Sequence, residues 1–338
     1  MNTAVSLASR LSVAPMMAWT DRHCRYFHRL MSKQALLYTE MVTAPALVLG
    51  GALRLLDFNP EEQPVALQLG GSDPEQLGRA TALGAAHGYD EINLNLGCPS
   101  DRVQSGSFGA VLMTELDVVR ACLEQMLQAS DSEVTVKCRI GVDDQIPQET
   151  LPDFLSMVQS TGVKRVTIHA RKAWLKGLSP KENRDIPPLN YPLVLQMKLA
   201  FPGLHLSING GVNSLAAVQD HLSAGLDGAM IGRAAYQNPY DILARVDCDV
   251  FEGDAAPSAD DIAEQMIPYI EAHLQKGERL HQITRHMFGL FAGQTGARHW
   301  RRRLSELGGQ HGSNLADYRI LLDEMRVILE QQQELEVG

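Results

Sequence analysis

The chain has 338 residues, of which 45% are hydrophobic and 21% are charged, and its formal net charge at pH 7 is −10. This composition is typical of a globular protein and argues against a disordered or fibrous chain. The longest stretch without a charged side chain, residues 199–219, is broken by Pro202, Gly203, Gly210 and Gly211, so we do not expect a membrane protein.

The termini and the cysteines restrict the class further. The N-terminus lacks an early basic segment followed by a long apolar run, which argues against secretion and favours the cytoplasm. The five cysteines form no C-x-x-C pair, so neither a disulfide framework nor a cysteine zinc site is indicated. We expect free thiols, no structural metal and a monomer.

Eight short runs of β-favouring residues recur along the chain. They cover residues 12–14, 35–40, 65–69, 91–95, 134–139, 165–169, 204–209 and 228–231. Most are separated by helical patterns with plausible starts, such as residues 76–87 after Asp73 and residues 215–224 after Ser214. Strands that alternate with helices form parallel βαβ units, and eight such units in roughly 240 residues predict a TIM (β/α)8 barrel. An open, doubly wound sheet is the structural alternative.

The chain changes character after the eighth unit. Residues 254–258 have the composition of a linker and a helix cap, and from residue 259 to 330 the apolar residues follow helical spacing. The α/β barrel is therefore assigned to residues 1–250, and a C-terminal all-helical domain to residues 258–338.

The residues that close the predicted strands are polar. In a TIM barrel the active site is built at the C-terminal ends of the strands, so these side chains are expected to meet at one mouth. They are Gln68, Asn95, Lys137, Arg139, His169, Arg171 and Asn209.

Two glycine-containing loops follow strands seven and eight. Asn209, Gly210 and Gly211 close one strand, and Gly232 with Arg233 follows the other. Backbone N–H groups in such loops bind phosphate, together with the dipole of the following helix. A phosphate-bearing ligand is therefore favoured over a tight turn.

The neighbouring strand ends indicate which ligand carries the phosphate. A fixed cation such as Lys137 stabilises the negative charge of a reduced flavin, and an amide such as Gln68 matches the donors and acceptors of its pyrimidine ring. Together with Pro15, Met16 and Met17 after strand one, these residues make FMN the better explanation.

Basic residues gather in two segments of this acidic chain. Residues 277–303 contain six arginines and only one acidic residue, Glu278. The arginines are Arg279, Arg285, Arg298, Arg301, Arg302 and Arg303, and Trp300 lies among them. A second segment, residues 171–185, has a net charge of +3. Such clusters favour an electrostatic RNA-binding surface over solvated helix faces.

At these residues the chain resembles the tRNA-dihydrouridine synthases, and most of all their A subfamily. The resemblance covers almost the whole chain, and two motifs are long and specific: EINLNLGCPSDRVQSGSFGAVLM at residues 91–113 and HARKAWLKGLSPKENRDIPPL at residues 169–189. Further matching strings are APMMAWTDRHCR, LYTEMV, VALQLGG, VKCRIG, INGG and GRAAYQNP. One departure is Val111, where many relatives carry a second cysteine; because Cys98 is intact, we expect no effect on catalysis.

The resemblance implies an FMN-dependent barrel with a helical tRNA-binding domain, which reduces uridine 20 or 20a in the D-loop of tRNA to 5,6-dihydrouridine with NADPH. The FMN-contacting residues would be Pro15, Met16, Met17, Gln68, Lys137, His169, Asn209, Gly210, Gly211, Gly232 and Arg233. The tRNA-contacting residues would be Asn95, Lys181, Arg184, Arg298 and Arg301, with Asn95 facing the target base.

The same resemblance makes Cys98 the general acid. Hydride from N5 of the reduced flavin adds to C6 of uracil, and C5 then needs a proton. An ordinary cysteine thiol is mostly protonated at neutral pH, so Cys98 could supply that proton without prior activation. An inert, buried thiol is the other interpretation of Cys98.

Two other classes of function remain open. The first is an FMN-dependent barrel acting on a free small molecule, of the dihydroorotate or enoate type, for which no basic C-terminal face is expected. The second is a non-catalytic RNA-binding barrel, for which neither a flavin nor a role for Cys98 is expected.

Overall fold

The computed structural model describes residues 3–100, 108–310 and 312–337. The chain forms two compact units. The first contains Met1–Ala18 and Ala35–Gly232, and the second contains Trp19–Gln34 and Arg233–Gly338. The expected boundary between residues 250 and 258 falls inside the second unit, which also includes a segment from near the N-terminus.

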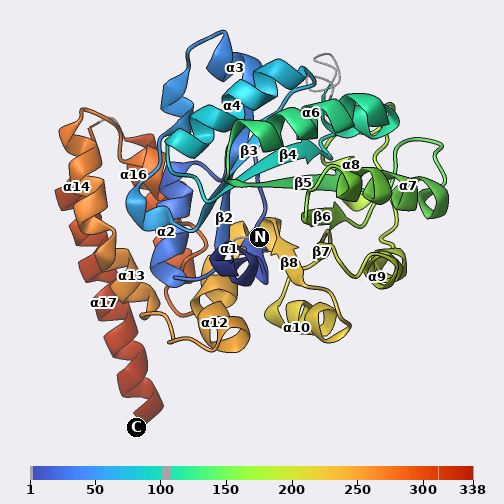
Figure 1. Cartoon of the computed structure of the whole chain (residues 1–338). Coiled ribbons are helices and arrows are strands. Elements are labelled where there is room, and N and C mark those ends of the chain that lie inside the picture. Colours follow the sequence, from blue (N-terminus) through green and yellow to red (C-terminus); the bar gives the residue numbers. More distant parts are fainter. Residues whose placement is uncertain (1–2, 101–107, 311, 338) are drawn as a thin grey trace. The chain divides into compact units, whose positions relative to one another are not determined.

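The first unit is a closed barrel of eight parallel strands, as predicted (Figure 1). Each strand pairs with the next in the chain, and β8 closes the barrel by pairing with β1. The strands are β1 (Leu11–Val13), β2 (Leu36–Thr43), β3 (Val65–Gly70), β4 (Glu91–Leu96), β5 (Glu133–Arg139), β6 (Arg165–His169), β7 (His205–Asn209) and β8 (Gly228–Ile231). All eight lie where the sequence predicts them, within a few residues, and the open-sheet alternative is wrong.

Helices connect the strands around the barrel (Figure 1). Those of the first unit are α1 (Thr3–Ala8), α3 (Ala44–Val48), α4 (Pro74–Ala86), α6 (Leu116–Ala129), α7 (Pro147–Ser160), α8 (Glu182–Asp185), α9 (Tyr191–Ala200) and α10 (Leu215–Ser223), with 3-10 turns η1 (Leu53–Leu56), η2 (Pro60–Glu62) and η3 (Gly109–Thr114). Two predicted helix starts are confirmed. The Asp73 carboxylate accepts the N–H of Gln76 at 2.8 Å, and the Ser214 hydroxyl accepts that of Ala217 at 3.2 Å.

The second unit is helical, as predicted for the C-terminal region. Its helices are α2 (Arg22–Met31), α11 (Arg233–Gln237), α12 (Pro239–Phe251), α13 (Ala259–Gln265), α14 (Ile267–Gln275), α15 (His281–Thr284), α16 (Ala297–Gly309) and α17 (Leu315–Val337). The fully buried Trp300 packs edge-on against Phe291 and Tyr318 and donates its indole N–H to Met287 O at 2.8 Å. Trp300 therefore belongs to the core of this unit.

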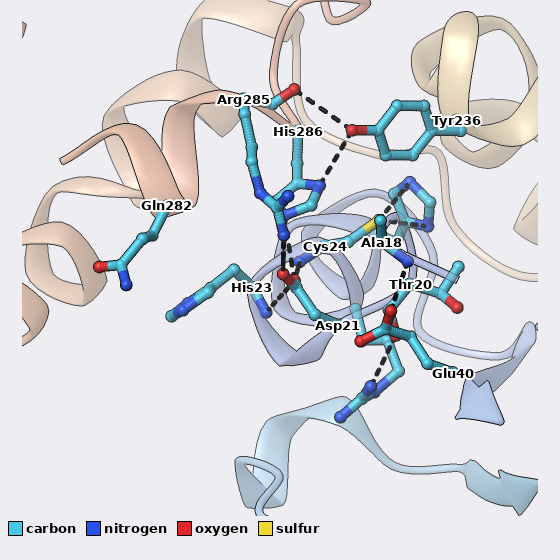
Figure 2. A network of polar contacts seen from close by, with 12 residues as sticks. Ala18, Thr20, Asp21, His23, Cys24, Glu40, Tyr236, Gln282, Arg285 and His286 are labelled. Atoms are coloured by element: carbon cyan, nitrogen blue, oxygen red, sulfur yellow. Dashed lines mark hydrogen bonds and ion pairs between the residues drawn. The ribbon is translucent and has the colours of Figure 1, made fainter. Parts of the chain in front are cut away.

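Asp21 joins α2 to the C-terminal helices of the second unit (Figure 2). Its carboxylate caps α2 by accepting the N–H groups of His23 and Cys24 at 3.0 and 3.1 Å. The same carboxylate pairs with Arg285 at 2.5 Å and with His286 at 3.0 Å. Burial alone would raise the pKa of Asp21, but the hydrogen bond and the charge of His286, together with the hydrogen bond from the Cys24 N–H, lower it. These ion pairs are among the contacts that connect Trp19–Gln34 with residues that follow the barrel in sequence.

Three further expectations concern thiols, metals and membranes. None of the five cysteines, all of which lie in the described part of the chain, forms a disulfide: Cys24, Cys122 and Cys138 are buried, Cys98 is partly exposed and Cys248 is exposed. Among the described residues, no group of three or more His, Cys, Asp or Glu side chains could hold a metal ion. In the same part of the chain, no helix combines the length and the apolar character needed to cross a membrane.

Candidate active site

The barrel places five of the predicted site residues at one rim. Gln68, Asn95, Lys137, His169 and Asn209 lie in the C-terminal halves of β3, β4, β5, β6 and β7, which are neighbours in the closed sheet. Four of them are nearly buried, with exposed fractions of 1% for Gln68, 8% for Asn95, 8% for His169 and 7% for Asn209. Polar side chains that are buried this far need partners, and their partners define the site.

The loop after β4 carries Cys98 and is held by Asn95. The carboxamide oxygen of Asn95 accepts the backbone N–H groups of Gly97 and Cys98 at 3.1 and 3.0 Å. The Cys98 carbonyl accepts the N–H of Ala110 at 2.9 Å, and its sulfur lies 3.5 Å from the Ser100 hydroxyl. Cys98 is therefore a partly exposed thiol on a hydrogen-bonded loop. Cys122 and Cys138, in contrast, are buried thiols, and burial raises the pKa of each to about 12.

Asn95 also contacts Gln68. Its amide N–H donates to the carboxamide oxygen of Gln68 at 2.7 Å, while the Gln68 amide donates to Asn93 at 2.9 Å. Two hydrogen-bonding roles of Asn95 are thus already used within the protein. The structure gives Asn95 a part in holding the Cys98 loop that the sequence did not predict, and its contact with a substrate base stays a prediction.

Lys137 and Asn209 form a pair across the rim. The Lys137 ammonium donates to the carboxamide oxygen of Asn209 at 3.0 Å, and the Asn209 amide donates to Met230 O at 2.8 Å. Burial, with a smaller contribution from the nearby charge of Arg139, lowers the pKa of Lys137 to about 8. Lys137 is therefore a cation whose charge is costly in this structure and which an anion would stabilise.

The backbone of the loop after β7 requires glycine at two positions. Gly210 and Gly211 have φ angles of +98° and +72°, which favour glycine. A Cβ at Gly210 would lie 2.6 Å from His169 Cδ2, and one at Gly211 would lie 2.5 Å from the Tyr191 hydroxyl oxygen. Glycine at both positions therefore lets the backbone of this loop pack closely against His169 and Tyr191.

His169 adds an unpaired polar atom beside this loop. Its Nε2 is buried and has no hydrogen-bond partner within the described residues. Burial and the charges of Arg139 and Lys137 hold the pKa of His169 well below its usual value, so the ring is neutral at pH 7. An unpaired polar atom, a glycine loop and a lysine at one rim fit a ligand with a phosphate and a polar ring.

The segment after β1 borders the loop after β8. A Cβ at Gly232 would lie 3.7 Å from both Ala14 Cβ and Met16 Sδ, and Ala14 donates its N–H to Ile231 O at 2.8 Å. Met17, with a 61% exposed side chain, follows in the same segment. Met16 and Gly232 are thus close, as expected for residues of one binding site. Arg233 is the first residue of α11, in the second unit.

The basic loop after β6 is fixed from inside by Asn183. This fully buried side chain accepts the N–H of Trp174 at 2.7 Å and donates to the carbonyls of Trp174 and Leu178 at 2.8 and 3.1 Å. Two nearby cations are exposed: Lys181, which precedes α8, and Arg184 within it. The loop therefore presents two cations on a backbone with fixed geometry.

Arg139 connects this loop to the Cys98 loop. It is 3% exposed and donates to Gly97 O at 3.1 Å, to Lys172 O at 3.0 Å and to Asn183 O at 2.9 Å. The sequence identified Arg139 as a strand-end cation but gave it no role. Its three carbonyl partners come from two loops, which only the folded chain brings together.

The arginine-rich segment of the second unit divides into paired and exposed members. Arg285 pairs with Asp21, and Arg303 pairs with Glu306 and Glu324 at 2.8 Å each. The interpretation of all six arginines as one RNA-binding cluster is therefore too broad. Arg298 and Arg301 are exposed and make no hydrogen bond or ion pair within the described residues, so their charges are available.

Comparison with solved structures supports the fold. An old yellow enzyme homologue from Zymomonas mobilis matches with a TM-score of 0.53 and 10% identity, over 75% of this chain and 91% of that one. A 2-naphthoyl-CoA reductase matches with a TM-score of 0.53 and 11% identity, over 71% of this chain and 50% of that one. Both likenesses concern the fold alone.

Comparison with known sequences establishes the family. Proteins named tRNA-dihydrouridine(20/20a) synthase are 58% identical in Vibrio parahaemolyticus, over 90% of this chain and 94% of the relative, and 56% identical in Shewanella oneidensis, over 93% of each. The Escherichia coli K12 protein of that name is 53% identical over 96% of this chain and 93% of its own length. A family model described as dihydrouridine synthase (Dus) matches residues 12–325. The chain belongs to the dihydrouridine synthase family.

Proposed function

We propose that this protein reduces uridine 20 or 20a in tRNA to 5,6-dihydrouridine, with FMN as cofactor and NADPH as reductant. Relatives that are 53–58% identical carry the name of that activity. The observation that supports it most strongly is a partly exposed thiol, Cys98, on a loop held at the same barrel rim as Lys137, His169 and the Gly210–Gly211 loop.

Residues of the first unit would hold the cofactor. The glycines at 210 and 211 offer backbone N–H groups to its phosphate, and Lys137 and His169 offer a cation and an unpaired ring nitrogen. Pro15, Met16, Met17, Gln68, Asn209 and Gly232 complete this part of the binding site, and Arg233 would contribute from the start of α11. When bound and reduced, FMN supplies a hydride to C6 of the uracil ring.

Cys98 would donate the proton. The S–H bond breaks as the C5–H bond forms, so uracil gains one hydride and one proton and NADPH is oxidised to NADP⁺ in the full cycle. Ser100, whose hydroxyl lies 3.5 Å from the sulfur, can then return a proton from solvent to the thiolate. Asn95 holds the Cys98 loop, so the sulfur stays in one place during the transfer.

The exposed cations would bind the nucleic acid. Uracil in a folded tRNA must leave its stack to reach a barrel mouth, at a cost of roughly a few kcal/mol. Contacts between phosphates and Lys181, Arg184, Arg298 and Arg301 would offset that cost. A barrel enzyme for a free small molecule would not need the exposed charges of Arg298 and Arg301.

A variant of Cys98 tests the assignment, with Cys248 as a matched control because it is an exposed thiol on α12. We expect Cys98→Ala to keep FMN and its reduction by NADPH but to lose turnover on tRNA by about 10²-fold or more, the scale of general-acid catalysis. Cys248→Ala should behave as wild type. Full activity of Cys98→Ala would contradict the role of the thiol, and a protein that stays colourless with added FMN would favour a non-catalytic RNA-binding barrel.

A further inference from the structure

A row of buried polar side chains runs along the inside of the barrel towards the Cys98 loop. Glu91, Asn93 and Asn95 alternate along β4, so all three face the same side of the sheet at successive levels. Asn93 lies in register with Gln68 on β3 and with Thr135 on β5. The exposed fractions are 0% for Glu91, 0% for Asn93 and 2% for Thr135. Nothing in the proposed mechanism uses these three residues.

The hydrogen bonds along this row all point the same way. Asn95 accepts from the loop N–H groups and donates to Gln68, and Gln68 donates to Asn93. Asn93 then donates to the Thr135 hydroxyl at 2.8 Å, and Thr135 donates to Glu91. Each side chain of the row therefore accepts a hydrogen bond from the group nearer Cys98 and donates one to the residue nearer Glu91.

Glu91 fixes that direction. Its carboxylate is paired with Arg165 at 2.6 Å and also accepts the Tyr38 hydroxyl at 2.6 Å. Burial and the neighbouring Glu91 raise the pKa of Tyr38 well above its ordinary value, so this hydroxyl stays protonated and donates. A carboxylate paired with arginine is ionised, so it can only accept hydrogen bonds. The Thr135 proton must therefore point to Glu91, which leaves the Thr135 oxygen to accept from Asn93.

The orientation of the Thr135 hydroxyl then determines the orientation of each carboxamide in turn. Because Asn93 must present its NH₂ group to Thr135, its oxygen faces Gln68. Gln68 must then present its NH₂ group to Asn93 and its oxygen to Asn95, so the oxygen of Asn95 is left for the Gly97 and Cys98 amides. Reversing any one carboxamide would place two donors or two acceptors in contact, which is costly for buried groups.

We propose that Glu91, Asn93 and Thr135 are positioning residues of the active site, which set the orientation of the Gln68 and Asn95 carboxamides and thereby hold the loop that carries Cys98. The expected effects on FMN affinity and on turnover rest on the proposed function, but the expected ordering of the Cys98 loop does not. The hydrogen bonds of the row join protein groups only.

The test compares two hydroxyl groups that donate to the same carboxylate oxygen of Glu91. Thr135→Val removes the one that lies in the row, and Tyr38→Phe removes the one that does not. Thr135→Ser keeps the hydroxyl and serves as the conservative variant. Asn93→Leu interrupts the row at its next member and replaces Thr135→Val if that variant does not fold, as judged by its melting temperature.

The first readout is amide hydrogen exchange at Gly97 and Cys98 in the cofactor-free protein. Loss of about one buried hydrogen bond in the row should accelerate this exchange roughly two- to tenfold in Thr135→Val and in Asn93→Leu. Tyr38→Phe and Thr135→Ser should stay within about twofold of wild type. Equal exchange in Thr135→Val and Tyr38→Phe would overturn the proposal.

The second readout is FMN affinity, together with the rate at which tRNA reoxidises the reduced flavin. Both should fall in Thr135→Val and recover in Thr135→Ser, while Tyr38→Phe keeps them. If Thr135→Val changes exchange but neither affinity nor rate, the assignment of these residues to the active site is wrong. A wild-type protein with slow exchange at Gly97 and Cys98 but no reaction with tRNA would contradict the proposed function and leave the ordering of the loop intact.

Discussion

Lys137 carries its positive charge at the barrel mouth against the effect of burial. Its pKa is lowered to about 8, mainly because burial disfavours the charged form, and its ammonium donates to the neutral carboxamide of Asn209. A cation in this state is destabilising in the free protein and becomes favourable when an anionic ligand binds. This is the pattern expected of a residue kept for function.

The cost of Lys137 should be measurable as stability. Because its folded-state pKa lies below the unfolded value of 10.5, the unfolded chain holds more protons between pH 8 and 10.5. The charge therefore costs stability in full below pH 8, and the cost is relieved as the pH rises towards 10.5. Lys137→Met should stabilise the cofactor-free protein by on the order of 1–2 kcal/mol at pH 7 and by little at pH 10.5.

Chemical denaturation at the two pH values checks this prediction. Lys198→Met is an unsuitable control, because Lys198 pairs with Asp227. Lys172 is partly exposed in the loop after β6, with its ammonium over the ring of Trp174, and Lys172→Met should show no such pH-dependent gain. A destabilised Lys137→Met at pH 7 would contradict the account of this residue.

The element of most consequence for the site is the pair of loops that Arg139 joins. The guanidinium contacts carbonyls of the Cys98 loop and of the loop after β6, and the latter is ordered further by Asn183. The loop that carries the thiol and the loop that carries the exposed cations are thus both bonded to one buried side chain. A change in Arg139 should affect both loops.

Arg139→Lys should keep the positive charge and lose most of these bonds, because an ammonium cannot reach three carbonyls as a guanidinium fork does. We expect faster proteolysis between residues 171 and 187 and a turnover on tRNA reduced by about 10-fold or more, since misplaced catalytic groups lose rate steeply. Arg120→Lys, on the outer helix α6, is the control, because Arg120 donates to the Ser160 hydroxyl at 2.9 Å and not to a loop carbonyl among the described residues. Unchanged proteolysis and turnover in Arg139→Lys would show that the loops are held by other contacts.

Sequence patterns predicted the strand ends well for a physical reason. Parallel strands of a closed barrel end at one rim, so Gln68, Lys137 and Asn209 could be brought together from their strand positions alone. The partners of these residues could not be predicted, because they depend on which side chains meet across the barrel. The hydrogen bond that Asn95 donates to Gln68 and the row from Gln68 to Glu91 are of this kind.

At the scale of the whole molecule, the second unit gathers residues from distant parts of the chain. The sequence assigned residues 1–250 to the barrel, but residues 19–34 belong to the helical unit, where Asp21 of that segment pairs with Arg285. The same contact shows that a count of arginines in the sequence includes a charge that is paired within the protein. Charges that neutralise each other in the folded chain are invisible in a linear count.

Arg298 and Arg301 should contribute to tRNA binding, whereas Arg319 should not. All three are exposed arginines of the second unit, so Arg319→Glu on α17 is a control with the same change in charge. Arg298→Glu and Arg301→Glu should weaken tRNA binding and each reduce the slope of log affinity against log salt by about 0.7–0.9. Bound FMN should be unaffected. Binding equal to that of Arg319→Glu would exclude these two arginines from the RNA contact.

The most direct measurement of the central claim is the position-resolved detection of dihydrouridine in tRNA. Unmodified tRNA is incubated with the FMN-loaded protein and NADPH, digested with a nuclease and analysed by mass spectrometry for the gain of two hydrogens in each fragment. The account predicts that the gain occurs at uridines 20 and 20a with the wild-type protein and is lost with Cys98→Ala. A gain at other positions only, or none with the wild-type protein, would contradict it.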